Sequence, residues 1–383
     1  MLQPGSARPR PPRGKAQAHP GVSPLSVHSD TKFEPLPNPL GLPPYHYDLE
    51  IVVPGITALA KKQGHLVFHT VGDTGGIKNS DYQAAVAAQM KGDLNLPPAT
   101  RPQFFYHLGD VVYYNGEIAD YYDQFYEPYD HYNAPIIAIP GNHDGDPASS
   151  AQTSLDGWVR YFMSATPQID PISGDAARVT LSLPNVYYTL NCPFATIMGL
   201  YTNVPEGGSV DSVQQQWLTN EFATAPADKA LIVALHHPIY SFDDHHSGSA
   251  AMADVVDRAI NDSRRVPNLV LSAHVHNYQR IERNIIENVA TPFLVVGHGG
   301  YYHLHGMTAD VGHKDKDLGA VLRFHDAYHH GYATITVDAQ NIKVTMTPVA
   351  ETGSPKHKKD AIPDEFSYSA KALYLPEGVT ISL

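Results

Sequence analysis

Short apolar runs recur along the chain, and most are separated by segments with the pattern of an amphipathic helix. This alternation is typical of strands that are joined through helices into a sheet. Strands are expected at residues 65–71, 103–109, 135–141, 230–235, 268–273 and 292–297. Helices are expected at 79–93, 116–126, 154–163, 211–225 and 249–262, and hairpins at 186–203 and 332–349. The sequence therefore predicts an α/β fold.

The domain organisation can be inferred from the distribution of linker-like segments along the chain. No Gly- or Ser-rich segment divides its middle, so we expect one large domain over residues 45–350. The Pro-rich residues 1–44 are expected to form an extended or disordered leader, and residues 351–383 a tail that packs on the domain. Residues 1–44 contain no apolar core of a secretory signal, which favours a cytoplasmic location. No run of 18 apolar residues occurs, so no membrane span is expected.

Charge and cysteine content narrow the choice of partners. The chain of 383 residues has 26 basic and 39 acidic side chains and a formal net charge of −13. Nucleic-acid surfaces neutralise phosphates with Lys and Arg, so this balance argues against such a partner. The single cysteine, Cys192, allows no intrachain disulfide. The 22 histidines are unusual, because no fold requires so many imidazoles.

Side chains with metal-ligand chemistry follow five of the expected strands. They are Asp73, Asp110, Tyr113, Asn142, His143, His236, His274 and His276. Successive strand ends within each half of this series are 32 to 38 residues apart, close to the length of one strand–helix–strand unit. Such ligands are expected at one edge of a sheet, where open α/β sheets bind their ligands. Because buried polar groups are costly unless something binds them, we expect a metal centre there.

Five motifs in this part of the chain resemble the blocks of the metallophosphoesterase superfamily, and most closely those of purple acid phosphatases. They occur in the family's order as GDTG at 72–75, GDVVY at 109–113, GNHD at 141–144, VALH at 233–236 and AHVH at 273–276. One position departs, since Ala273 replaces the usual glycine and its methyl group is expected to crowd the backbone beside His274. The resemblance implies a four-layer α/β/β/α sandwich with a binuclear metal centre at the carboxyl ends of the strands.

The resemblance also divides the ligands between two metal ions. It implies one ion held by Asp73, Tyr113 and His276, a second held by Asn142, His236 and His274, and Asp110 bridging the two. Carboxylates and a phenolate suit Fe(III), while an amide oxygen and two imidazoles suit a divalent Fe, Mn or Zn. Tyr113 carries the likeness to the purple subgroup. If Tyr113 only packs at the end of its strand, both metals would be divalent.

Three further histidines are expected to act on the substrate. His143 follows Asn142 without belonging to the ligand set, so it is the candidate acid. Asp144 either accepts the other N–H of His143 or caps the turn. His245 and His246 resemble a histidine pair that faces the substrate in plant members of the family. Their alternative role is that of solvated residues in a surface loop.

The segment 297–331 holds seven more histidines and is long for a connection. Long ordered loops tend to be functional, so we expect a lid or rim over the site. Loop histidines without fixed ligand spacing are more often solvated than metal-binding. A third metal site in this segment is therefore the less favoured interpretation.

The implied activity is that of an acid phosphatase acting on phosphate monoesters. A metal-bound hydroxide would attack phosphorus in line, and His143 would protonate the leaving group. A phosphodiesterase or nucleotide pyrophosphatase on the same metal core is the alternative enzyme. A non-catalytic binding module is disfavoured, because no ligand position is lost. The expected partner is a small phosphate ester, with no nucleic acid and no membrane.

Overall fold

The structure is a computed structural model that describes residues 32–315, 319–349 and 360–381. Within these residues the larger sheet has eight strands. Their spatial order is β1 (His46–Asp48), β5 (Tyr188–Asn191), β6 (Ala195–Gly199), β7 (Ala230–Ala234), β9 (Leu269–Ser272), β11 (Val289–Val296), β10 (Tyr278–Ile286) and β12 (Val321–Asp326). Strands β6, β7, β9 and β11 run parallel to one another, while β5, β10 and β12 join through antiparallel pairs.

The second sheet of the described residues has six strands. Their order is β15 (Asp364–Ser369), β14 (Asn341–Pro348), β13 (Gly331–Asp338), β2 (His65–Val71), β3 (Phe105–His107) and β4 (Ile136–Ala138). Strands β2, β3 and β4 are parallel, whereas β13 pairs with β2 in the antiparallel sense. A small ribbon joins β8 (Arg265–Val266) to β16 (Leu373–Tyr374).

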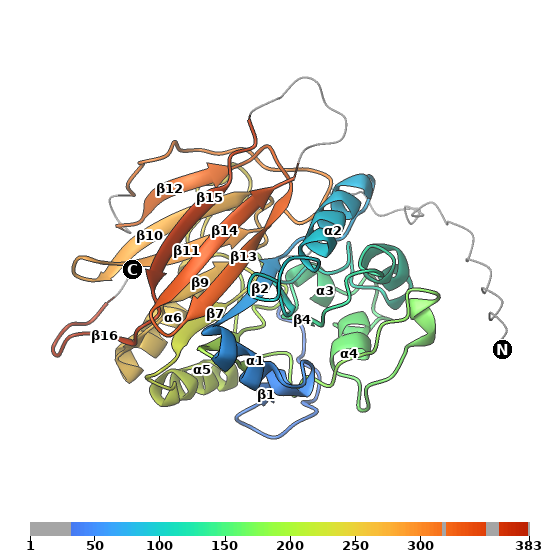
Figure 1. The fold of residues 1–383 in the computed structure, drawn as a ribbon, viewed down its shortest axis with the longest axis horizontal. Coiled ribbons are helices and arrows are strands. Elements are labelled where there is room, and N and C mark those ends of the chain that lie inside the picture. The colour runs from blue at the N-terminus through green and yellow to red at the C-terminus, as the bar shows by residue number, and fades with distance from the viewer. Residues whose placement is uncertain (1–31, 316–318, 350–359, 382–383) are drawn as a thin grey trace.

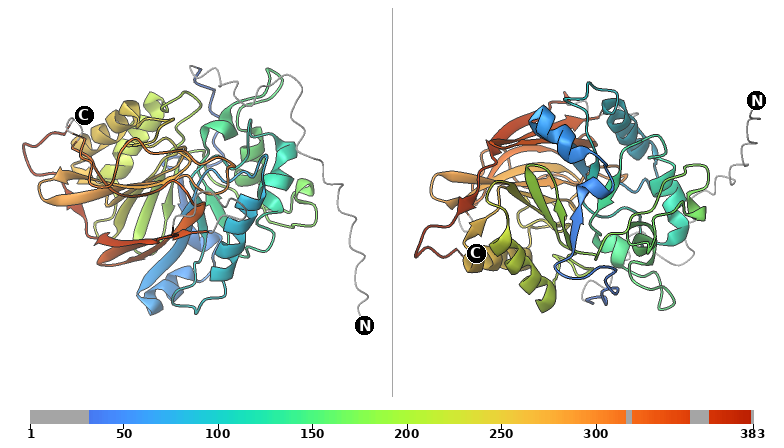
Figure 2. Two further views of the ribbon diagram at one scale, coloured as in Figure 1. Left: turned by 90° about the horizontal axis from the view of Figure 1, so that it is seen from above. Right: turned by 60° about the horizontal axis from the view of Figure 1, so that its bottom comes forward.

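Helices cover the outer faces of both large sheets. The α-helices of the described residues are α1 (Ile56–Gln63), α2 (Asp81–Asp93), α3 (Asn142–Gly145), α4 (Asp156–Phe162), α5 (Ser212–Thr224) and α6 (Ala250–Ser263). The two sheets lie face to face, with α5 and α6 outside the eight-stranded sheet and α1 and α2 outside the six-stranded one (Figures 1 and 2). This arrangement confirms the predicted α/β/β/α sandwich. None of the helices in the described ranges is long and apolar enough to cross a membrane.

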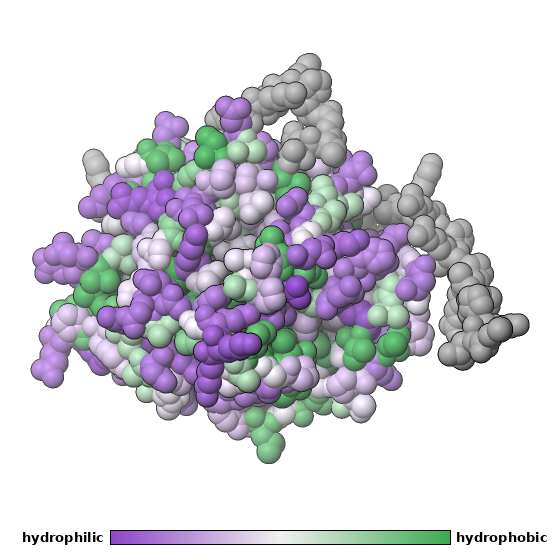
Figure 3. Space-filling model, viewed as in Figure 1, coloured by the Kyte–Doolittle hydropathy of each residue, from purple (hydrophilic) through white to green (hydrophobic). Residues whose placement is uncertain are grey.

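The strands that lead to the predicted ligands are buried along nearly their whole length. Every residue of β3, β4, β7 and β9 is buried, and β2 is buried after its first residue. Helices cover one face of these strands and the other sheet covers the opposite face, which explains their continuous apolar runs. By contrast, in edge strand β15 exposed residues alternate with buried or half-buried ones. On the surface, polar side chains dominate the face in Figure 3, and apolar ones form small scattered groups.

The predicted helix at 116–126 is only partly helical. Ile118–Asp120 forms a 3₁₀ turn and Tyr122–Tyr126 a π-helical turn. The side chain of Gln124 bonds both backbone groups of Tyr113, and the Gln83 amide donates to the Gln124 carbonyl. These tertiary bonds replace the regular helical pattern, and the turn thereby supports the backbone at Tyr113.

A buried ion pair connects the two sheets near the end of the chain. Arg280 of β10 donates through Nε and Nη2 to the Asp364 carboxylate of β15, at 2.8 and 3.0 Å. The Tyr278 hydroxyl also donates to Asp364, at 3.1 Å. The Asp364 side chain is 5% exposed and that of Arg280 17%. The pair therefore holds β15 against the other sheet.

Asp364→Ala should lower the free energy of unfolding by about 3 kcal/mol, because the largely buried Arg280 guanidinium loses its bidentate partner and keeps only Glu282, at 3.5 Å. The matched control is Glu365→Ala, the next residue of β15, which breaks the exposed ion pair with Lys343 of β14. This control should cost less than about 1 kcal/mol. Urea unfolding of the two variants measures the difference, and equal losses would show that the Arg280 pair does not stabilise β15.

Candidate metal centre

The predicted ligands come from two sheets instead of one sheet edge, which corrects the expectation from their spacing. β2, β3 and β4 of the six-stranded sheet lead to Asp73, Asp110 and Asn142. β7 and β9 of the eight-stranded sheet lead to His236 and His274. Two strands joined through a helix have the same spacing in sequence whether they belong to one sheet or to two. The sequence alone therefore did not show that the ligands come from different sheets. The centre therefore lies where the ends of both sheets meet.

Three of the ligand positions have an unusual backbone conformation. Asp73, Asp110 and His274 have φ values of 55°, 53° and 66°, in the left-handed region. Each follows the end of a strand by two or three residues. This conformation costs roughly 1–2 kcal/mol for a residue with a Cβ atom, so the surrounding structure must enforce it. Local strain of this kind clusters at functional sites.

Asp73, Tyr113 and His276 form one group of side chains. The Tyr113 hydroxyl donates to Asp73 Oδ1 at 3.0 Å and lies 3.3 Å from His276 Nε2. His276 Nε2 is 3.5 Å from the same Asp73 oxygen. Asp73 Oδ2 accepts the backbone N–H of His274, so this carboxylate also connects the two sheets. All three side chains are buried.

Asn142, His236 and His274 form a second group. Asn142 Oδ1 lies 3.0 Å from His236 Nε2 and 3.0 Å from His274 Nδ1. His236 Nδ1 bonds the carbonyl of Leu108 at 2.8 Å, which leaves Nε2 directed toward Asn142 and Asp110. Backbone carbonyls commonly orient ligating histidines in this way. The amide oxygen and two ring nitrogens are thus oriented toward one point.

Asp110 lies between the two groups. Its Oδ1 accepts the backbone N–H of His143 at 2.9 Å. Its Oδ2 is buried without a hydrogen-bond partner among the described residues, and His236 Nε2 is 3.3 Å away. Asp73, Asp110 and His236 each offer a ligand atom within 4.8 Å of the others. A buried carboxylate oxygen without a donor is expected where a cation binds, so the residues present fit a metal centre.

The pKa values of the buried residues also fit a metal centre. Burial raises the pKa of Asp73 well above its ordinary value. Burial opposes protonation of His236, but the charge of Asp110 outweighs it and raises the pKa of His236 to about 9. Without a cation, this cluster therefore holds protons to compensate its buried carboxylates. Metal ions would displace those protons, because ligands bind metals in their deprotonated forms.

His143 lies beside the centre on the one-turn helix α3. Its Nδ1 bonds the carbonyl of Tyr114 at 2.8 Å, and its ring centroid is 4.5 Å from that of Tyr113. Asp144 does not hold this ring. Its carboxylate accepts the backbone N–H groups of Gly141, Val111 and Val112 at 2.9 to 3.2 Å. Asp144 therefore caps the turn instead of accepting an N–H of His143. Its bonds to Val111 and Val112 also fix the loop that carries Asp110.

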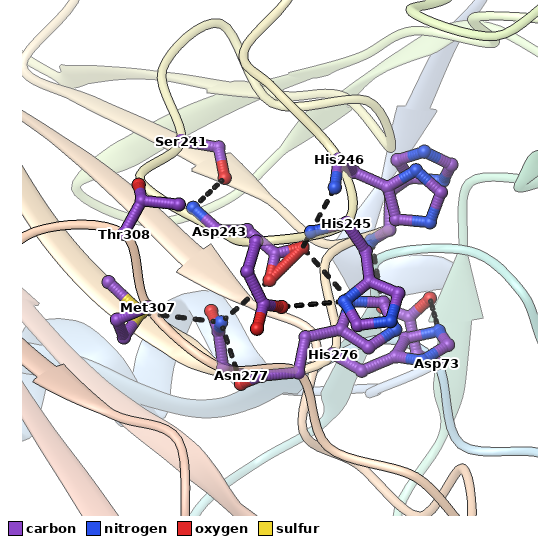
Figure 4. Close-up of polar contacts among 12 residues, drawn as sticks. Asp73, Ser241, Asp243, His245, His246, His276, Asn277, Met307 and Thr308 are labelled. Carbon is purple, nitrogen blue, oxygen red and sulfur yellow. Dashed lines mark hydrogen bonds and ion pairs between the residues drawn. The ribbon is translucent and has the colours of Figure 1, made fainter.

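The structure separates the two histidines of the 245–246 pair. The ring centroid of His246 lies 4.4 Å from that of His274, and His246 Nδ1 bonds Glu206 Oε1 at 2.9 Å. His245 lies farther out, with its ring stacked on His305 at 4.3 Å. Figure 4 shows this loop beside His276 and Asp73. Only His246 of the pair therefore contacts a predicted ligand directly.

Glu206 is a site residue that sequence reasoning missed. Its Oε1 also lies 3.6 Å from His274 Nε2, so one carboxylate faces two histidines. These histidine contacts hold the pKa of Glu206 well below its ordinary value. Glu206 follows β6 in a loop without a motif, and the sequence carries no signal for it. Tyr301 was missed too, although its ring lies 4.1 Å from that of His276 and 4.6 Å from that of Tyr113.

Of the histidines in the 297–331 segment, His305 comes closest to the centre. Its ring centroid is 4.5 Å from that of His276, and its backbone N–H donates to the His276 carbonyl. His298, by contrast, is buried against Tyr278, and neither of its ring nitrogens has a hydrogen-bond partner in the described chain. The described part of this segment thus supplies the rim of the centre at Tyr301 and His305.

The departure at Ala273 is accommodated by a glycine on the other sheet. A Cβ atom placed on Gly72 would lie only 2.5 Å from the Ala273 methyl group. Gly72 has no side chain, so the methyl group fills this space instead of displacing the backbone beside His274. The next contacts of such a Cβ would be Leu108 Cβ at 3.1 Å and the Gly109 carbonyl at 3.2 Å.

Gly72→Ala should therefore destabilise the protein by about 1–3 kcal/mol through overpacking. In Gly72→Ala/Ala273→Gly the severe clash is removed, and most of this loss should be recovered. A double-mutant cycle with urea unfolding measures the coupling. Additive effects of the two substitutions would show that these residues do not compensate each other.

Comparisons with known proteins agree with this geometry. A family model described as calcineurin-like phosphoesterase matches residues 66–278, more than half of the chain. The 3',5'-cyclic adenosine monophosphate phosphodiesterase CpdA of Escherichia coli K12 is 24% identical over 197 residues. That match covers 49% of this chain and 61% of CpdA, so the chain spans less than two thirds of this relative.

Two solved structures show the same fold at low identity. Purple acid phosphatase PPD1 from yellow lupin (Lupinus luteus) seeds superposes with a TM-score of 0.57 and 18% identity, covering 80% of this chain and 54% of PPD1. GAP50, described as the anchor in the inner membrane complex of Plasmodium, superposes with a TM-score of 0.55 and 16% identity, covering 80% of this chain and 89% of GAP50. Because one is a phosphatase and the other is described as an anchor, the shared fold does not decide the activity.

Proposed function

The chain belongs to the calcineurin-like phosphoesterase family, and from this premise we propose that it is a binuclear metal-dependent hydrolase of phosphate esters. The observation that carries the proposal is the convergence of seven side chains in two groups. Between them lies Asp110 Oδ2, which has no hydrogen-bond partner among the described residues and is 3.3 Å from His236 Nε2. Asp73, Tyr113 and His276 would hold one ion, and Asn142, His236 and His274 the other. Asp110 would bridge both.

Two metal ions bound there would supply an activated water for in-line attack on phosphorus and positive charge for the phosphoryl oxygens. The protein's own groups would complete the site. The Tyr114 carbonyl engages His143 Nδ1, so proton exchange with a leaving group would take place at Nε2. His246, held by Glu206 beside His274, is suited to contact the phosphate from the other side. His245 belongs to the outer rim.

The finer proposal is a phosphomonoesterase that resembles purple acid phosphatases and holds Fe(III) with a divalent Fe, Mn or Zn. The position of the Tyr113 hydroxyl supports it, since the phenol oxygen lies 3.0 Å from Asp73 Oδ1 and 3.3 Å from His276 Nε2. A phenolate beside a carboxylate is a hard donor set that favours a trivalent ion.

Tyr113→Phe should abolish a visible phenolate-to-iron absorption band while metal binding survives. Elemental analysis and an absorption spectrum of the purified protein measure both. The control is Tyr301→Phe, whose ring packs on Tyr113 but whose hydroxyl has no proposed role in ligation; it should keep the band. A colourless, iron-free and active wild type would overturn the iron assignment and leave a pair of divalent metals.

A phosphodiesterase is the second candidate, and the similarity to CpdA favours it. The same metal core can serve monoesters and diesters, so the discriminating test compares them directly. We expect nitrophenyl phosphate to be hydrolysed with a higher kcat/KM than bis-nitrophenyl phosphate and a cyclic nucleotide. The reverse order would replace the monoesterase with the diesterase. The absence of hydrolysis by fully metallated protein would overturn both.

A further inference from the structure

A second histidine cluster lies at the rim of the metal centre. His245, His303 and His305 each offer a ring nitrogen, and these atoms lie within 4.8 Å of one another. His305 is buried, whereas His245 and His303 are exposed. The cluster thus opens toward solvent on one side and contacts His276 through His305 on the other. None of these three residues belongs to the proposed binuclear ligand set.

Two of the three rings are already oriented by carboxylates. Asp244 Oδ1 lies 2.6 Å from His245 Nδ1, and Asp243 Oδ2 lies 3.0 Å from His305 Nδ1. In each ring Nε2 remains for another partner. Histidines that bind metals usually donate their other ring N–H to a carboxylate or a carbonyl, which fixes the tautomer and makes the ligand more basic. In this cluster Asp244 supports His245 and Asp243 supports His305 in this way.

The two loops that carry the cluster are joined through their backbones. Asp244 donates its N–H to the carbonyl of Gly306 at 3.2 Å, and Thr308 donates to that of Phe242 at 2.8 Å. A Cβ atom on Gly306 would lie 2.5 Å from Asp244 Oδ2, so the glycine makes room for this carboxylate.

Hydrogen bonds also hold the Asp243 side chain in place. Its Oδ2 also accepts the backbone N–H groups of His245 and His246 at 3.2 and 3.0 Å, as Figure 4 shows. The carboxylates that orient the histidines are therefore in place before any ligand arrives.

We propose that His245, His303 and His305 bind a third metal ion, a divalent transition metal such as Zn²⁺. Imidazole nitrogens select zinc-like ions over Mg²⁺ or Ca²⁺. Zn–N bonds of roughly 2.0–2.1 Å place tetrahedral ligands about 3.4 Å apart. The rings of His245 and His305 are stacked with an interplanar angle of 14°, so binding one ion requires the exposed His245 ring to turn out of this stack and direct its nitrogen at the ion. An ion here would join the two loops and add positive charge at the mouth of the site, where a phosphate ester enters.

The test counts zinc per chain after equilibrium dialysis of the full-length protein against micromolar free Zn²⁺. His303→Ala and His245→Ala should each bind one ion fewer than the wild type. Their double variant should also bind one fewer, because both histidines hold the same ion. The matched control is His131→Ala, an exposed histidine that likewise pairs with a neighbouring aspartate, Asp130; it should bind as many ions as the wild type.

A second experiment measures zinc binding at the histidine cluster separately from binding at the binuclear centre. In the Asp110→Asn background, which should empty the centre, one Zn²⁺ should remain and should be lost on adding His303→Ala. Circular dichroism checks that each variant is folded. Equal zinc content in the wild type and His303→Ala would overturn the rim site whatever the centre binds. So would the loss of two ions in the double variant, or Mg²⁺ occupying the cluster at the same concentration.

Discussion

Asp110→Asn should lose bound metal together with phosphoester hydrolysis, and activity should fall by at least about 100-fold. Replacing even the outer partners of metal ligands commonly costs 10–100-fold, and Asp110 is the proposed bridge itself. Its Oδ2 lies between the two ligand groups without a hydrogen-bond partner among the described residues. A neutral amide cannot bridge two cations as a carboxylate does. Elemental analysis and an activity assay on the same preparation measure both effects.

The control for this substitution is Asp93→Asn. Asp93 is a partly buried carboxylate that accepts from the Tyr332 hydroxyl and faces His69, outside the proposed ligand set. This variant should keep its metal even if its stability falls. Full metal content in Asp110→Asn would show that the bridge has been assigned to the wrong residue.

His143→Ala should slow hydrolysis by about 10²–10⁴-fold for an alkyl phosphate and much less for nitrophenyl phosphate. A basic alkoxide needs a proton to leave, whereas nitrophenolate does not. His143 is oriented for this role by Tyr114, and its backbone N–H bonds Asp110. The measurement is the ratio of the two rate losses, with metal content checked in both proteins. Equal losses would assign His143 to binding the phosphate, and the acid would then be sought at His246.

Much of the proposed centre could be predicted because its side chains directly follow apolar runs. The strands before Asp73 and His236 are buried on both faces, so their sequences are continuous and easy to recognise. Strand β10 was missed for the opposite reason. It alternates buried residues with partly exposed ones such as Arg280 and Glu282, and its charged side chains conceal a strand within the sheet. Edge strand β12 has similar polar interruptions.

Other parts of the site depend on contacts that no local pattern encodes. Glu206 approaches His246 and His274 from a loop 40 and 68 residues away in sequence. The compensation between Gly72 and Ala273 joins two sheets, and only the folded structure shows why the extra methyl group is tolerated. The different positions of His245 and His246 likewise depend on Asp243, which fixes the turn that carries them.

The sheet order constrains when the centre can form during synthesis. All seven proposed ligands precede residue 277, yet β2 pairs with β13, whose residues 331–338 emerge later. This pairing spans more than 260 residues of sequence, and contacts of such separation form slowly because a long loop must close first. When all seven ligands have been synthesised, the chain therefore still lacks β13, the strand that pairs with β2 in the six-stranded sheet. Metal capture should accordingly follow the synthesis of β13.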